Sequence, residues 1–205
     1  PGDVCWADLN NDGVINNLDR VKVGNLFPTV TGGFSTTLGY KDFSLYARFD
    51  YALGHTLYND LAARSLGQYQ GSFNIIDMVK DSWSETNQDT DIPKFYYADQ
   101  LSKKNITRSN NGLTAVDNNS SRFYEKGDYL ALREITLTWN LPKKWINKAL
   151  MSNASVYVTG QNLFYITGYT GVSPEPAVDT TYGQGLDNGR YPTPKTVLLG
   201  LSVTF

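Results

Sequence analysis

Oxygen-bearing side chains recur at every second position in one stretch near the start of the chain, DLNNDGVINNLD, residues 8–19. A hard cation such as Ca²⁺ takes about six to eight oxygen ligands, and a twelve-residue loop supplies them from places 1, 3, 5, 7, 9 and 12. Gly13 occupies the sixth place, where the chain must turn sharply and a Cβ would clash. The predicted ligands are Asp8, Asn10, Asp12, Val14 through its carbonyl oxygen, Asn16 and Asp19.

The twelfth place of this loop holds Asp19, although a Glu there usually gives the bidentate contact. The shorter side chain predicts weak binding, with a dissociation constant on the order of 10⁻⁴ to 10⁻³ M. One interpretation is a structural clip for Ca²⁺, with Mg²⁺ as the second candidate ion and Ile15 as the apolar anchor. The other is a pair of Asx turns without metal, because Asn, Asp and Gly all favour turns. The full match of the ligand places favours the metal.

Composition and charge exclude several classes of function. The net charge is −2, which gives no electrostatic basis for binding nucleic acid. The only histidine is His55 and the only cysteine is Cys5, so we expect no zinc cluster, internal disulfide or histidine-based triad. The carboxylates of Asp179 and Asp187 lie in a predicted loop with no base or nucleophile beside them. We therefore predict that the protein is not an enzyme.

Five segments of about ten residues alternate apolar and polar side chains, as a strand with two different faces does. A two-residue turn at Lys41 and Asp42 would set Leu38 opposite Leu45, so register and face agree across the first hairpin. The opening residues show no secretory signal, and we expect a piece of a larger protein. The five segments are residues 34–43, 43–53, 133–142, 154–164 and 196–205.

Ten residues is about the length that a tilted strand needs to cross a bilayer, whereas strands of soluble sandwiches are usually nearer 5–6 residues. Short turns on one side and long loops, residues 54–128 and 165–195, on the other are typical of outer-membrane barrels. We predict an all-β fold, an antiparallel transmembrane β-barrel segment with short helices in extracellular loops. Residues 1–30 form an extracellular segment with the calcium motif, and residues 31–205 form the barrel strands. A soluble, calcium-stabilised adhesion or carbohydrate-binding module remains the alternative.

Aromatic side chains near the strand ends are expected to form interfacial girdles. One residue conflicts with this scheme, because Arg133 shares the parity of Ile135 and Leu137, and an arginine facing lipid at the midplane costs about 2–4 kcal/mol. Either Arg133 lies above the hydrocarbon or a bulge resets the parity. The predicted girdle residues are Tyr40, Phe43, Trp139, Phe164, Tyr165 and Phe205.

The long loops give weaker indications. Four-residue spacing of Ile75, Val79 and Trp83 predicts a short helix with one apolar stripe. Several tyrosines could stack on sugar rings, with ordinary packing as the competing interpretation for each of them. These are Tyr69, Tyr96, Tyr97, Tyr169 and Tyr182.

Five segments follow one another along the chain: the loop 8–19 followed by DRVKVGN, then WSETNQDTDIPKF, SSRFYEKGDYLALREITLTWNLP, VYVTGQNLFYITGYTG and YPTPKTVLLGLSVTF. Together they resemble the C-terminal part of a SusC/RagA-type TonB-dependent transporter. The resemblance spans nearly the whole chain. It departs from the family at residues 171–175, which read GVSPE where the family usually has Gly, an aromatic residue, Asp, Pro and Glu.

The resemblance implies the last five strands of a barrel of about 22 strands, in a Gram-negative outer membrane with the C-terminus in the periplasm. It further implies uptake of oligosaccharides or peptides, a SusD-like surface lipoprotein as partner, and a TonB complex that contacts an upstream part of the transporter. Phe205 would be the terminal aromatic residue read by the assembly machinery.

Overall fold

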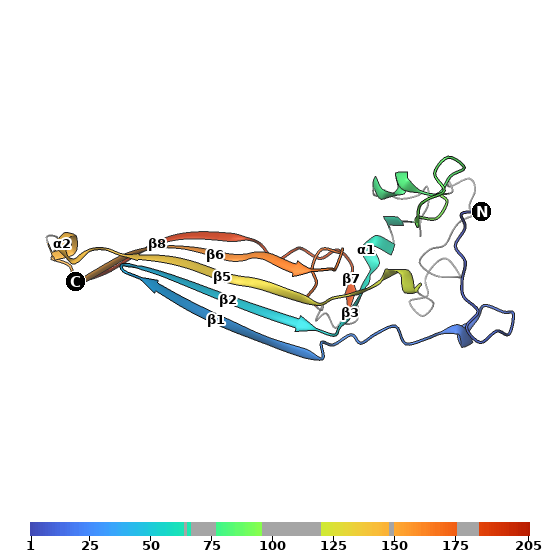
Figure 1. The fold of residues 1–205 in the computed structure, drawn as a ribbon, viewed down its shortest axis with the longest axis horizontal. Helices are drawn as coiled ribbons and strands as arrows, with labels where there is room; N and C mark the ends of the chain where they lie inside the picture. Colours follow the sequence, from blue (N-terminus) through green and yellow to red (C-terminus); the bar gives the residue numbers. More distant parts are fainter. Residues whose placement is uncertain (64, 67–76, 96–119, 148–149, 176–184) are drawn as a thin grey trace.

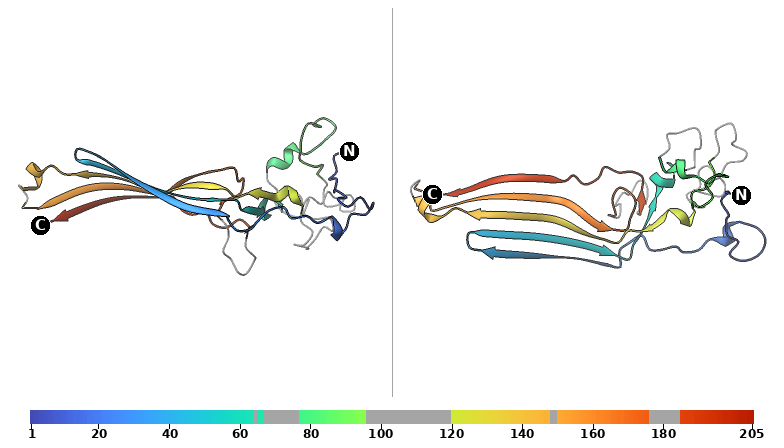
Figure 2. Two further views of the ribbon diagram at one scale, coloured as in Figure 1. Left: turned by 60° about the horizontal axis from the view of Figure 1, so that its bottom comes forward. Right: turned by 45° about the horizontal axis from the view of Figure 1, so that its top comes forward.

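The computed structural model describes residues 1–63, 65–66, 77–95, 120–147, 150–175 and 185–205. Five long strands form one antiparallel sheet in the order β1-β2-β5-β6-β8, which confirms the predicted architecture. Figures 1 and 2 show this sheet as a single, elongated and twisted layer. The strands are β1 (Val30–Tyr40), β2 (Phe43–Leu53), β5 (Tyr129–Asn140), β6 (Asn153–Thr167) and β8 (Thr196–Thr204).

The two ends of the sheet differ in the length of their connections. At one end, here called the turn end, Lys41 takes a left-handed φ of 52° in the β1–β2 turn, and the short helix α2 (Lys143–Ile146) lies between β5 and β6. The long connections and the N-terminal segment lie at the opposite end, here called the loop end (Figure 1). The chain thus places short turns and long loops on opposite sides, as predicted.

A second, smaller sheet at the loop end was not predicted. Its order is β4-β3-β7, with β3 (Thr56–Asn59), β4 (Tyr124–Lys126) and β7 (Leu186–Asp187). A buried cluster joins this sheet to two neighbouring elements. Its members are Tyr58 on β3, Ala63 on α1 (Asp60–Ala63) and Phe123 on the 3-10 turn η6 (Ser121–Phe123). This cluster of buried apolar side chains therefore lies at the loop end.

A bulge in β5 resolves the position of Arg133. The β2–β5 register shifts between Arg48 and Phe49, and the β5–β6 register shifts between Leu132 and Glu134. Arg133 falls outside both ladders, and Asn162 on β6 takes a φ of 51° beside the same irregularity. A bulge inserts an unpaired residue and re-aims its side chain. The prediction that a bulge resets the parity is confirmed.

The register divides the large sheet into an apolar and a polar face. On the apolar face, Phe43 stacks on Trp139 at the turn end (centroids 6.0 Å), and Phe34 stacks on Phe49 nearer the loop end (5.0 Å). Aliphatic rows lie between these aromatic rows. The rows across the sheet are Tyr40, Phe43, Trp139, Val156 and Leu201; Leu38, Leu45, Leu137, Val158 and Leu199; Thr36, Ala47, Ile135, Gly160 and Val197; and Phe34, Phe49, Leu132 and Phe164.

Two expectations about single segments change. Tyr165 pairs with Ala131 on the polar face, so its assignment to the lipid-facing girdle was wrong; it shares that face with Tyr157 and Thr159, as alternation along β6 requires. The helix expected around Val79 is only the 3-10 turn η3 (Asp77–Asp81), while Ile75 lies outside the described residues. In the part of the chain that the structure describes, no helix is both long and apolar enough to cross a membrane.

Candidate functional site

The polar face carries a charged cluster, the Arg133 cluster, near the loop end. The Arg133 Nε donates to Asp50 on β2 (2.6 Å), and its terminal nitrogens donate to the Tyr165 hydroxyl on β6 (3.1 Å) and to the Glu175 carboxylate. The Tyr165 hydroxyl in turn donates to Glu175 (2.9 Å). The guanidinium carbon also lies 5.6 Å from the centroid of the Tyr165 ring. One arginine thus joins three strands to the segment that follows β6.

The chemistry of the Arg133 cluster is that of a clamp. Arginine presents donors in a fixed planar fork, so it can hold two carboxylates at once with defined geometry. Asp50 and Glu175 accept those bonds. The side chain of Arg133 is 15% exposed, which limits screening by water. The cluster fixes residues 168–175, here called the strap, against the polar face.

His55 holds the strap at the neighbouring residue. The His55 ring is 1% exposed and its Nε2 lies 2.9 Å from the carbonyl oxygen of Pro174. Because a carbonyl oxygen only accepts, Nε2 must carry the proton. A Cβ on Gly127 would come within 2.2 Å of this nitrogen, so only glycine fits under the ring. The single histidine of the chain is therefore structural, and no pattern in the sequence predicts this contact.

Two further carboxylates fix the strap to the small sheet. Glu125 on β4 accepts bonds from the backbone N–H of Thr170 (2.9 Å) and from its hydroxyl (2.8 Å). Asp187 on β7 accepts bonds from the Tyr169 hydroxyl (2.7 Å) and the backbone N–H of Val172 (3.3 Å). Burial and the adjacent Asp187 carboxylate raise the pKa of Tyr169 well above its ordinary value, so the phenol stays a donor.

These contacts show the roles of some of the residues predicted from the sequence. Asp187 is 7% exposed and satisfied by backbone and phenol donors, so it is a structural acceptor; Asp179 lies outside the described residues. Tyr169 is equally buried and does not present its ring to a sugar. The other four tyrosines considered for stacking lie outside the described residues. They are Tyr69, Tyr96, Tyr97 and Tyr182.

The loop 8–19 closes on itself through its own backbone. Asp8 accepts from the N–H groups of Asp12 (3.2 Å) and Gly13 (2.7 Å), and Asp12 accepts from that of Val14 (2.8 Å). Asp19 accepts from Leu9 (2.8 Å) and from Asn16 (2.7 Å), which joins the two ends of the loop. Gly13 takes a left-handed φ of 82°, as the sixth place requires.

The donor set of this loop fits a calcium site in type and order. Asp8 and Asp19 approach each other, and hydrogen bonds led by that from Asn16 hold the pKa of Asp19 below its ordinary value. Ile15 is exposed within the described residues, so the anchor role predicted for it is not observed. No three acidic, histidine or cysteine side chains of the described residues lie close enough to hold one metal ion. Binding would need the amide and carbonyl ligands, Asn10, Asn16 and Val14, as well.

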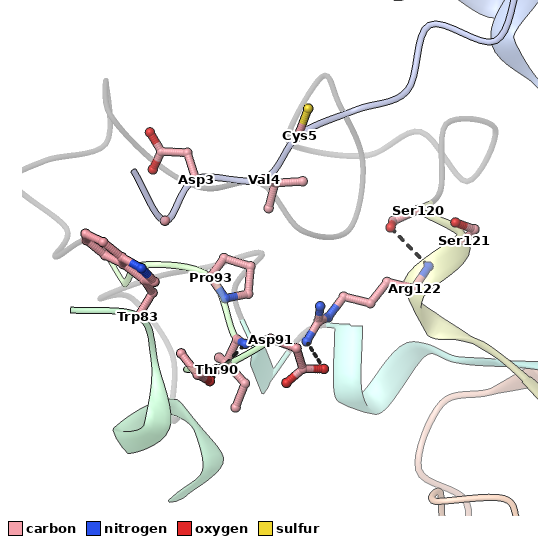
Figure 3. A pocket seen from close by; sticks show the side chains of 12 residues that line it. Asp3, Val4, Cys5, Trp83, Thr90, Asp91, Pro93, Ser120, Ser121 and Arg122 are labelled. Atoms are coloured by element: carbon pink, nitrogen blue, oxygen red, sulfur yellow. Dashed lines mark hydrogen bonds and ion pairs between the residues drawn. The ribbon is translucent and has the colours of Figure 1, made fainter. Parts of the chain in front are cut away.

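A cavity of about 370 Å³ lies between the N-terminal segment and the long connection that precedes β5 (Figure 3). Arg122 and Asp91 form an ion pair on one side (3.4 Å), and Trp83 lines the other. The Gly2 backbone covers the Trp83 ring so closely that a Cβ there would come within 2.4 Å. The ring is therefore used for packing.

Comparisons with known proteins agree with this architecture. No family model matches the chain. It is 31% identical over 211 residues to TonB-dependent receptor P3 of Formosa agariphila, covering 100% of the chain and 19% of the receptor. It is 25% identical over 207 residues to TonB-dependent receptor SusC of Bacteroides thetaiotaomicron, covering 100% and 18%. The chain spans about a fifth of the length of the curated relatives that it matches.

Among solved structures, the chain resembles one described as the RagAB peptide transporter, with a TM-score of 0.65, 26% identity and coverage of 88% of this chain and 17% of that one. The single-layer sheet with its banded apolar face is thus a segment of the wall of a TonB-dependent receptor barrel. The chain belongs to the SusC/RagA type of TonB-dependent receptors.

Proposed function

We propose that this chain forms part of the wall of an outer-membrane importer that takes up glycan oligomers or peptides with energy supplied through TonB. The observation that carries the proposal is the division of one long sheet into an apolar face with aromatic rows and a polar face with a fixed charged cluster. In a barrel, the first face meets lipid and the second lines the lumen. The chain alone would not transport, because its relatives are about five times longer.

The loop end is proposed to be extracellular and the turn end periplasmic. Outer-membrane barrels have short periplasmic turns and longer extracellular loops, and the connections of this sheet divide in the same way. The strap, fixed by the Arg133 cluster and His55, then lies at the outer mouth of the lumen. Residues 1–30 belong to the extracellular part, and residues 31–205 to the barrel with its loops.

A SusD-like surface lipoprotein is the proposed partner at this outer mouth. The small sheet and the strap form a hydrogen-bonded unit that could present a fixed surface to a cap, since Glu125 and Asp187 both hold backbone groups of the strap. Co-purification of the full receptor with the lipoprotein tests this. Exchange of residues 120–126 and 168–175 for those of a relative should weaken the complex, whereas exchange of the turn 41–42 should not.

A soluble calcium-stabilised module is the competing function. In water, such a module must cover the apolar face of its sheet, and the described residues contain no second layer over that face. Cell fractionation separates the two proposals. The receptor should be recovered only in detergent-solubilised outer membrane, and recovery in buffer would support the module.

Import is tested in cells that lack the receptor and are complemented with the full-length gene. Labelled glycan oligomers and labelled peptides of matched size are offered separately. We expect uptake of one class, lost when the TonB complex is deleted. Uptake that is equal with and without the receptor would exclude the proposal, and the class that enters identifies the substrate.

The loop 8–19 is proposed to bind one Ca²⁺ as a structural clip. Six ligand places, the glycine and the meeting of the loop ends at Asp19 support this. When bound, the ion would supply charge neutralisation for Asp8, Asp12 and Asp19, while the loop keeps the segment before β1 in a defined shape. The alternative remains a loop held by Asx turns alone.

A further inference from the structure

The turn end gathers basic side chains beside the apolar face. Residues 141–152 contain three lysines and no Asp or Glu. Two of these lysines, Lys143 and Lys144, lie on α2 and are exposed. Across the sheet, the Lys41 ammonium lies over the Tyr40 ring, 5.3 Å from its centroid. Within the described turn-end residues 40–43, 141–147 and 150–152, the only acidic side chain is Asp42.

Helix α2 is docked on the sheet by an aromatic contact. The Trp145 ring meets Trp139 edge-on, with centroids 5.9 Å apart, and Trp139 stacks on Phe43. Ile146 is 2% exposed, and its carbonyl oxygen accepts from the N–H of Met151 (3.2 Å), which holds the helix in place. Since Trp139 belongs to the apolar face, Trp145 lies at the edge of that face. It remains 56% exposed.

The two basic segments are neighbours. The backbone N–H of Asn140 donates to the carbonyl oxygen of Asp42 (2.8 Å), so the β1–β2 turn lies directly beside the entry to α2. Lys41 and the helix that carries the two α2 lysines therefore both adjoin the aromatic row of Tyr40, Phe43 and Trp139. Three cationic side chains against one acidic side chain give this margin an excess of positive side-chain charge.

We propose that the turn end is a binding site for an anionic phospholipid, with Lys143, Lys144 and Lys41 around the headgroup phosphate and the Trp139–Trp145 pair against the upper acyl chains. Lysine binds phosphate as a point charge and extends its apolar stem along an apolar surface. Tryptophan favours the depth of the headgroups, and basic clusters next to a membrane segment attract anionic lipid. The inference rests on the proposed membrane function of the apolar face.

A phospholipid fits this margin better than a soluble anion. The basic segments adjoin the row of Phe43 and Trp139, and this row continues into the aliphatic rows of the apolar face, which only a ligand with acyl chains would cover. A free phosphate would leave Trp145 exposed and gain nothing from Trp139. The aromatic pair and the lysines together therefore select a ligand with one charged end and one apolar end.

The test uses the full-length receptor, purified in detergent and delipidated. Native mass spectrometry counts bound phosphatidylglycerol during titration, with phosphatidylethanolamine as the zwitterionic comparison. The variant K143Q/K144Q should bind phosphatidylglycerol about 30-fold more weakly. The control K22Q/K126Q removes two exposed lysines at the loop end and should bind like the wild type. Equal binding by K143Q/K144Q, or equal losses in both variants, would overturn the site.

A second variant and a competitor keep the result specific. W145A leaves all lysines in place and should also weaken binding of the lipid, while inorganic phosphate at the same concentration should not displace it. Unchanged binding by W145A, or displacement by phosphate, would reduce the site to a bare anion contact and contradict the proposal. Membrane recovery and uptake by K143Q/K144Q are measured separately. Failure of the wild type to enter the membrane would instead reject the proposed function.

Discussion

Arg133 joins the wall of the sheet to the strap through side chains from four segments of the chain. Asp50 lies on β2, Tyr165 on β6 and Glu175 in the strap, and each accepts a bond from the one guanidinium. Removing the cation would leave two carboxylates on the same partly buried surface. Hydrogen bonds to charged groups contribute about 1.5–3 kcal/mol each, less where water screens them.

Substitution of Met for Arg133 is therefore expected to loosen the strap without unfolding the sheet. Amide hydrogen exchange at Thr170 and Val172 should accelerate. The strap would have lost its contact with Arg133, so the bonds that these two N–H groups donate to Glu125 and Asp187 would open more often. Exchange followed by mass spectrometry on the full receptor measures this. Arg48, an exposed cation on the same face, gives the matched control R48M, which should leave the strap unchanged. If R133M and R48M exchange alike, the Arg133 cluster does not fix the strap.

The double substitution D8A/D12A tests the proposed calcium loop at the same scale. Loss of two carboxylate ligands should abolish calcium binding by this segment, because the remaining ligands carry a single negative charge. Calorimetry on the full receptor, with D3A as the control outside the loop, measures the lost site. Calcium binding that is the same in D8A/D12A and in the wild type would leave the Asx turns as the whole explanation of the sequence.

The same loop predicts a dependence on pH. The backbone N–H of Asn16, and then that of Leu9, lower the pKa of Asp19 in the folded loop. A carboxylate with a depressed pKa stabilises the fold above its unfolded pKa of about 3.9, and this contribution is lost as pH falls through the lower folded value. Exchange protection of Leu9 and Asn16 should therefore persist at pH 5 and decline at more acidic pH. In D19N this decline should be absent, and an identical profile in D19N would contradict the assignment.

At the scale of the elements, β8 allows a close test of the two faces. Leu199 pairs with Val158 on the apolar face, and its neighbour Leu198 pairs with Thr159 on the polar face. The two positions lie at the same depth and begin from the same residue type. Gly200 is a poorer polar-face control, because a Cβ there would come within 2.1 Å of the Tyr157 ring.

We expect L199R to destabilise membrane insertion by about 2–4 kcal/mol, because the arginine would face hydrocarbon. L198R should cost much less, since its side chain would enter the lumen. Reversible folding of the full receptor into lipid vesicles, followed by the heat-dependent shift of folded barrels in electrophoresis, compares the two. Equal effects would show that the faces are assigned wrongly.

The elements differ in how much of them the sequence allows one to predict. The five long strands are recoverable because alternation over ten residues is a strong local signal and the faces agree between partners. The small sheet is not, because β7 has only two residues and pairs with β3 from a distant part of the chain. Pairings of that kind depend on the surrounding packing and leave no periodicity.

From the sequence, the Arg133 cluster was apparent only because Arg133 did not fit the alternation of apolar and polar residues in its strand. Parity against Ile135 singled out Arg133, but its partners could not be inferred, because Glu175 reaches it through the return of the strap. Tyr165 was misassigned for a different reason, since it lies near the end of β6 but shares the parity of Tyr157 and Thr159 on the polar face. The irregularity at Arg133 inverts the faces of β5 on its two sides, so alternation taken from one half of the strand mispredicts the other half.

At the scale of the whole molecule, the described sheet is unfinished. Strands β1 and β8 each pair on one edge only within the described residues, and the apolar face lies uncovered. The accessible surface is 13435 Å², whereas a compact monomer of 22.9 kDa exposes about 9600 Å². Free edges and an apolar face both favour association with other strands.

The isolated chain is therefore expected not to fold as a monomer in buffer. Its five strands would pair through β1 or β8 with other copies, because no strand of the described residues pairs with their outer edges. Circular dichroism with size-exclusion chromatography should show aggregates rich in β structure in buffer, and partial rescue in detergent, which covers the apolar face but leaves the edges open. The same chain placed after the upstream strands of a relative should form a heat-stable barrel in that detergent. A monodisperse, cooperatively melting monomer in buffer would mean that the sheet completes itself, which is incompatible with a place in the wall of a larger barrel.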